Sequence, residues 1–202
     1  MKRPAASPRP SDDKTCKAET GRSRADWFAA IEQSGASGRA AIGKFLLAQK
    51  MDAWWISTIT VDFEHAKGIV EKDKKPKGYS ICSTKSVAAS SARTYEALTS
   101  ASDLREWFGP GARIEATENG ELRDDDGVRG QITKLRPEKA IVFAWNAPDF
   151  GDGSVVEILI QPKGEKTGLV VNHTRIQSRA DADGLREAWA DALNRLKAHV
   201  ER

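Results

Sequence analysis

The stretch DADGLREAWADALNRLKAHV, residues 181–200, decides how this chain folds. Its apolar residues recur every three or four positions: Leu185, Ala188, Trp189, Ala192, Leu193, Leu196 and Val200. That spacing predicts an amphipathic helix, with Asp181 or Asp183 as the residue that caps its start. Burying its five large side chains would contribute about 8–15 kcal/mol gross, at roughly 1.5–3 kcal/mol each. The helix must therefore lie against a large apolar surface.

Residues 112–176 supply that surface as a series of alternating strands. The side chains predicted to share one face are, strand by strand, Ile141, Phe143 and Trp145, then Val156, Ile158 and Ile160, then Leu169, Val171 and His173. Such alternation is typical of an antiparallel sheet with one buried face. The Asp126-Gly127 dipeptide predicts a hairpin turn, and the segments RPEK, PDFGDG and PKGEKTG mark the later turns.

Two helices are expected before this meander. A strand at 79–89 leads into a helix that begins at Ser90 or Ser91, and Ser102 is expected to cap a shorter helix that Gly109 interrupts. The order is strand, two helices, antiparallel meander and long helix.

The first third of the chain is predicted to be helical between residues 22 and 68. Ser23, followed by Asp26, resembles a capping box, and Gly35 supplies a stop signal. Ser37 is expected to cap a second helix. Residues 52–68 fit both a strand and a helix, because their apolar residues satisfy both spacings.

Composition indicates four segments: a disordered tail at 1–14, a small helical domain at 15–70, a linker at 71–78 and a second domain at 79–202. Residues 1–78 carry 15 lysines and arginines against 10 aspartates and glutamates. This basic excess lies largely in the tail and the linker, so nucleic-acid binding is not indicated.

The sequence also bears on location and redox state. No apolar run reaches the roughly 18 residues of a membrane helix, and the basic N-terminus is followed by acidic residues instead of the apolar core of a secretory signal. Cys16 and Cys82 have no metal-binding or disulfide spacing. We therefore expect a cytoplasmic protein with two free thiols.

Several segments resemble a known family. They are LREWFGPGARIEATENGELR (104–123), VRGQITKLRPEKAIVFAWNAP (128–148), VEILIQP (156–162), LVVNHTRI (169–176) and LREAWADALNRLKAHV (185–200). They are similar to bacterial homologues of the heat shock protein 90 ATPase activator, within the START and pollen-allergen (SRPBCC) superfamily. The resemblance implies an α+β helix-grip fold at 79–202, in which an antiparallel sheet wraps around a long C-terminal helix. Residues 25–35 and 52–68 resemble a small all-α domain of unknown function, which favours helix at 52–68.

The resemblance implies a cavity between sheet and helix. The candidate ligand-binding residues are Trp107, Phe108, Phe143, Trp145, Ile158, Val171, His173, Trp189 and Leu193. His173 is the inward polar residue. It has no inward acidic partner in the sequence, so we predict a structural histidine and no catalytic residue. Neither a metal site nor a cofactor is indicated.

Two functions are favoured by the sequence, and an enzyme such as a cyclase or hydrolase is a third, less supported one because no acid and base are paired. The first is a non-catalytic protein whose cavity binds a small hydrophobic or amphipathic ligand. The second is a co-chaperone-like or stress-response interaction module with a filled core, in which the helical domain could contact a protein partner. Cavity volume separates them, because ligand pockets commonly measure about 300–1,000 Å³.

Overall fold

The computed structural model describes residues 9–147 and 153–202. The chain divides into two compact units, one formed by Ser7–Tyr79 and the other containing Ser80–Arg202. Each unit has its own elements and its own core, and each is described by itself.

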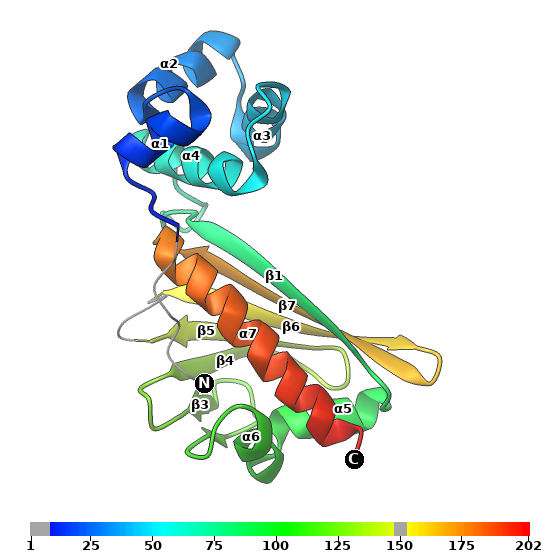
Figure 1. Cartoon of the computed structure of the whole chain (residues 1–202). Coiled ribbons are helices and arrows are strands. Elements are labelled where there is room, and N and C mark those ends of the chain that lie inside the picture. Colours follow the sequence, from blue (N-terminus) through cyan, green and yellow to red (C-terminus); the bar gives the residue numbers. More distant parts are fainter. Residues whose placement is uncertain (1–8, 148–152) are drawn as a thin grey trace. The chain divides into compact units, whose positions relative to one another are not determined.

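The first unit is a bundle of four helices (Figure 1): α1 (Asp13–Thr20), α2 (Arg24–Ser34), α3 (Gly38–Ala48) and α4 (Ala53–Ala66). Its core consists of Cys16, Trp27, Ile31, Ile42, Leu46, Met51, Trp55, Ile59 and Phe63. The segment that fitted both a strand and a helix forms α4, so the helical alternative is confirmed.

Local hydrogen bonds explain where these helices begin and end. The capping box predicted for α2 is confirmed, because the side chains of Ser23 and Asp26 each accept from the other residue's backbone N–H. Gly35 ends the helix at φ 68°, a left-handed conformation that glycine adopts without steric cost. Ser37 occupies the capping position of α3, but its hydroxyl makes no capping hydrogen bond.

Helix α1 was not anticipated. Its first residues, Asp13 and Lys14, belong to the stretch expected to be a disordered tail; residues 1–8 of that stretch lie outside the described residues. Arg9 forms ion pairs with Glu19 at 2.6 Å and with Asp52 at 2.8 Å. These contacts connect the segment before α1 to the helical bundle.

A buried carboxylate and its arginine partner bond the last residues of this unit to its helices. The carboxylate of Glu64 on α4 accepts three hydrogen bonds from Arg39 on α3, two from Nε and one from Nη2, and Nζ of Lys77 lies 3.6 Å from it. The same guanidinium donates to the carbonyl of Gly78. Such pairing is what a buried charge needs to be tolerated. The end of the predicted linker is therefore bonded to the bundle.

The second unit contains a seven-stranded antiparallel sheet with the order β1-β7-β6-β5-β4-β3-β2. Its strands are β1 (Tyr79–Val87), β2 (Arg113–Ile114), β3 (Glu121–Arg123), β4 (Arg129–Arg136), β5 (Ala140–Asn146), β6 (Ser154–Lys163) and β7 (Lys166–Ile176). Helices α5 (Ser91–Thr99) and α6 (Ala101–Trp107) connect β1 to β2, and α7 (Arg179–Val200) lies across one face of the sheet (Figure 1). This confirms the predicted α+β helix-grip fold.

The strand register agrees with the predicted faces. Along β6, Val156, Ile158 and Ile160 are buried, while the residues between them are half-buried. Ile158 lies opposite Ile141 on one side and Val171 on the other, so the inward rows are continuous across strands. The inner face of the sheet is therefore apolar, as the burial of α7 requires.

Two predicted caps were wrong. Helix α7 begins after Ser178, whose hydroxyl accepts from the backbone N–H of Asp181, so neither Asp181 nor Asp183 caps it. Likewise Ser100, instead of Ser102, caps α6 through the N–H of Asp103. In both cases the serine has an extended backbone and its hydroxyl accepts a hydrogen bond from the first turn, whereas the residues predicted as caps lie inside the helix.

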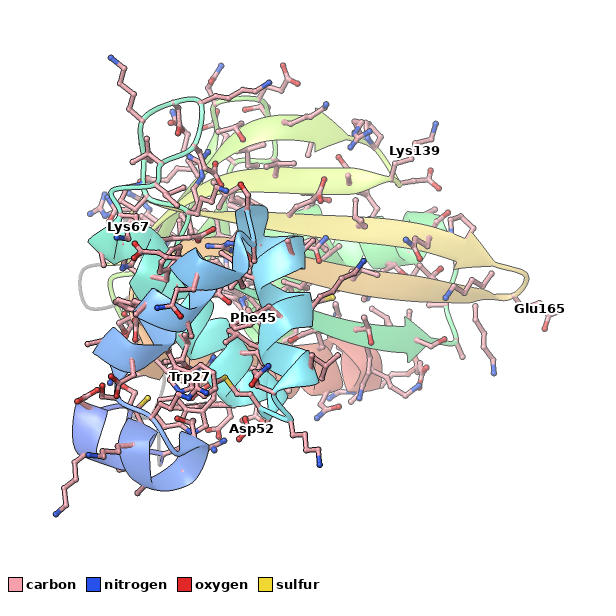
Figure 2. All side chains as sticks on the ribbon, turned by 90° about the horizontal axis from the view of Figure 1, so that it is seen from above. Trp27, Phe45, Asp52, Lys67, Lys139 and Glu165 are labelled. Carbon is pink, nitrogen blue, oxygen red and sulfur yellow. The ribbon has the colours of Figure 1, made fainter. Side chains whose placement is uncertain are left out.

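The hairpin turns follow from their residues. The carboxylate of Asp124 accepts from the N–H groups of Asp126 and Val128, and Gly127 takes φ 89°, which confirms the predicted β3–β4 turn. Glu165 lies at the tip of the β6–β7 hairpin (Figure 2). The turn predicted at PDFGDG falls almost wholly on residues 148–152, outside the described residues.

Within residues 9–147 and 153–202, no helix is both long and apolar enough to cross a membrane.

Candidate functional site

The nine residues predicted to line a cavity are all buried in the sheet unit: Trp107, Phe108, Phe143, Trp145, Ile158, Val171, His173, Trp189 and Leu193. They come from β5, β6, β7 and α7, and from the last residue of α6 and the one that follows it. The inward parity of the strands and the stripe of α7 place them in one core.

The aromatic rings of this set contact one another. The ring centroid of Trp145 lies 5.8 Å from those of both His173 and Trp189, and its indole also packs edge-on against Phe108 and Phe143. Such tilted and edge-to-face contacts between rings are favourable. Trp145 is therefore the centre of an aromatic cluster in which sheet and helix meet.

The space left inside this cluster is small. A cavity of about 10 Å³ lies between Trp107, Phe108, Phe143, Trp145, Ile158 and Trp189, together with Leu98, Leu104 and Leu122. A single water needs roughly that much, and ligand pockets commonly measure about 300–1,000 Å³. At this place the large side chains fill the interior.

His173 is the polar centre of the core, and both of its ring nitrogens have partners. The indole Nε1–H of Trp189 donates to Nδ1 at 3.2 Å, and Nε2 lies 2.8 Å from Oγ of Ser154. The sequence identified His173 as inward but missed both partners. Alternation along β6 offered a signal, since Ser154 shares the inward parity of Val156.

The hydrogen bond from Trp189 fixes the tautomer of His173. An indole nitrogen can only donate, so Nδ1 must be the acceptor and the ring proton must be on Nε2. Nε2 then donates to the Ser154 hydroxyl. In this tautomer Nε2 cannot take a proton from Ser154, although a serine–histidine contact of 2.8 Å has the geometry of a nucleophile and its base.

Burial also keeps the imidazole of His173 neutral. Desolvation lowers its pKa from the usual 6.5 to about 3, because the buried ring cannot carry a charge without solvent. The ring is therefore a neutral hydrogen-bonding bridge between β6 and α7 at physiological pH.

One polar atom of the cluster has no partner among the described residues. The Nε1–H of Trp145 is buried and donates to none of them. Ser154 lies directly opposite Trp145 in the β5–β6 register. Buried donors without partners are uncommon in folded proteins, so this atom marks a place where a small acceptor would be stabilised.

Metal binding has no support in the described part of the chain, where no group of three or more His, Cys, Asp or Glu residues could hold an ion. Cys16 is buried in the helical unit, and burial raises the pKa of its thiol. Cys82 is exposed on β1.

The second unit resembles known proteins in sequence and in fold. Residues 88–201 match the family described as activator of Hsp90 ATPase homolog 1-like protein. CalU16 from Micromonospora echinospora has a TM-score of 0.55 at 21% identity, covering 60% of this chain and 75% of its own. The Aha1 dimer from Colwellia psychrerythraea has a TM-score of 0.55 at 22% identity, covering 61% and 96%. MLL2253 from Mesorhizobium loti has the same TM-score at 17% identity, covering 61% and 98%. The TM-scores show a shared fold, and at these identities they show the fold alone. No curated protein matches the sequence.

Proposed function

Because the chain belongs to the family of activator of Hsp90 ATPase homolog 1-like proteins, we propose that it is a co-chaperone-like interaction module with a filled core. Its partner would be an Hsp90-family ATPase, and its sheet unit would contact that partner through its surface. The helical unit would be a second contact module on the same chain.

The volume of the interior carries this proposal. A cavity of about 10 Å³ cannot admit a fatty acid or a polyketide, because such ligands need a pocket some thirty times larger. The rings of Phe108, Trp145 and Trp189 occupy the space that a ligand would need. A domain whose interior is full works through its surface.

The direct test is the turnover of a purified Hsp90-family ATPase with and without the full chain. We expect the chain to bind the ATPase and to raise its turnover in a saturable manner. A chain that neither binds the ATPase nor changes its turnover, while its NMR spectrum shows that it is folded, would disprove the proposal.

A second function is favoured by the unpartnered Nε1–H of Trp145. With Ser154 and His173 beside it, the interior has a polar end that could hold the carbonyl or hydroxyl group of a small ligand once the rings move apart. Native mass spectrometry of the protein purified from its own host distinguishes the two functions. A co-purified small molecule would support the ligand-binding function, and the mass of the bare chain would support the filled core.

A further inference from the structure

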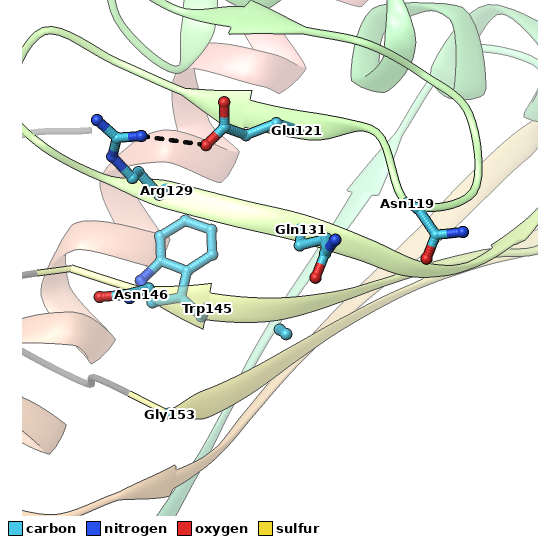
Figure 3. A pocket seen from close by; sticks show the side chains of 8 residues that line it. Asn119, Glu121, Arg129, Gln131, Trp145, Asn146 and Gly153 are labelled. Atoms are coloured by element: carbon cyan, nitrogen blue, oxygen red, sulfur yellow. Dashed lines mark hydrogen bonds and ion pairs between the residues drawn. The ribbon is translucent and has the colours of Figure 1, made fainter.

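A separate hollow lies on the outer face of the sheet, away from α7. It has a volume of about 400 Å³ and is lined by residues of β3, β4 and β5 and by residues beside them (Figure 3): Asn119, Glu121, Arg129, Gln131, Ala144, Trp145, Asn146 and Gly153. Its size lies within the range of small-molecule sites.

The strand register explains why the hollow forms there. Gln131 on β4 lies opposite Ala144 on β5, and Arg129 lies opposite Asn146, so these four side chains share the outer face. Glu121 on β3 continues the first row beside Gln131. Ala144 is small, whereas Gln131 across β4 and Asn146 along β5 have longer polar side chains and Val155 across β6 is branched. The depression follows from one short side chain among larger ones.

Three of the eight residues that line the hollow carry primary amides. The side chains of Asn119, Gln131 and Asn146 are exposed, and none of them is hydrogen-bonded to another described residue. Each amide offers both donors and acceptors in one plane. The outer hollow therefore presents several free hydrogen-bonding groups of both kinds.

The remaining residues of the lining exclude several classes of ligand. Arg129 already pairs with Glu121 at 3.3 Å (Figure 3), so an anion would have to compete for it. A single carboxylate is a poor cation site. The ring of Trp145 is 1% exposed, so it offers no face on which a nucleobase could stack. An alkyl chain in the hollow would cover the exposed amides without giving them hydrogen-bond partners, which disfavours a lipid.

We propose that the outer hollow binds an uncharged polyhydroxylated molecule of monosaccharide or disaccharide size. Hydroxyl groups both donate and accept, which is what a cluster of free amides recognises. Such a site is independent of the filled interior and of any chaperone partner, so its failure would leave the proposed function untouched.

The test is a titration of the ¹⁵N-labelled full chain with glucose, maltose and myo-inositol, followed by NMR. We expect one of these probes to shift the side-chain NH₂ signals of Asn119, Gln131 and Asn146 in a saturable manner. Binding with a Kd of about 10 mM or tighter is strong enough to give a saturable shift in this titration.

Matched variants on one strand locate the binding. Ala144→Leu fills the hollow and should weaken binding at least about tenfold. Val142→Leu lies two residues away on the same face, outside the lining, and should leave the Kd within about twofold. Gln131→Ala keeps the strand intact if Ala144→Leu disturbs the sheet, and should also weaken binding.

Three results would overturn this proposal. They are the absence of saturable shifts with all three probes, an unchanged Kd in both Ala144→Leu and Gln131→Ala, or saturation by inorganic phosphate or adenosine but by none of the probes.

Discussion

Lowering the pH should destabilise the sheet unit through His173. In the folded chain its pKa is about 3, because burial removes the solvent that would stabilise the charged ring. In the unfolded chain a histidine has a pKa near 6.5. Below about pH 6.5 the unfolded chain therefore takes up a proton that the folded chain refuses, and the free energy of unfolding falls as the pH falls.

The size of the effect follows from the two pKa values. At pH 5 the pH is about 1.5 units below the pKa of the histidine in the unfolded chain. The free energy of unfolding is therefore ~2 kcal/mol lower than at neutral pH. Asp103 does not contribute in this window. The hydrogen bond from Arg93 lowers its carboxyl pKa to about 2, so its contribution is lost only below its ordinary value of 3.8.

Urea unfolding at pH 7 and pH 5, followed by the backbone amide signals of β6 and β7, measures the difference. His173→Gln removes the titrating group and keeps an amide that can bond both Ser154 and Trp189. It should lose ~2 kcal/mol less than the natural chain between the two pH values. His65→Gln, an exposed histidine on α4, is the matched control and should change nothing. Equal pH dependence in the natural chain and His173→Gln would refute the reasoning.

Three further predictions test the packing, a helix cap and the division of the chain. Leu193→Ala should lower the free energy of unfolding in urea by about 2–5 kcal/mol, because the side chain is buried. Leu159 is half-buried, so Leu159→Ala should lower it by less than ~1 kcal/mol. Equal losses in the two variants would contradict the strand register. Ser23→Ala should destabilise the helical unit by about 1 kcal/mol, and Ser37→Ala, which loses no capping bond, should leave its thermal midpoint unchanged. Trypsin should cut first within residues 71–78, most of which are exposed, and leave a folded fragment that begins near the start of β1. If that fragment is unfolded, the chain does not consist of two independent units.

Features encoded by a few neighbouring residues could be predicted from the sequence. The capping box at Ser23 and the stop at Gly35 depend on groups within three positions of each other. The stripe of α7 and the alternation along β6 repeat often enough to fix which face is buried. Errors occurred where two local signals competed, as at the start of α7, where Ser178 caps the helix although two aspartates follow within five residues.

The candidate site was only partly predictable. Parity placed Trp145 and His173 inward, and the structure brings them together with Trp189. Whether the space between them is open depends on the summed volume and tilt of rings from α6, β5 and α7, which no single segment encodes. The outer hollow was missed for a related reason, because Gln131 and Ala144 become neighbours only through the β4–β5 register.

The central claim is that the interior of the sheet unit is filled. Its most direct test is a titration of the folded full chain with a long-chain fatty acid, followed through indole fluorescence and compared with a Trp145→Phe variant. Because the cavity is about 10 Å³, we predict no saturable change in the natural chain. A saturable one-to-one response that Trp145→Phe weakens would contradict the filled core and favour a ligand-binding protein.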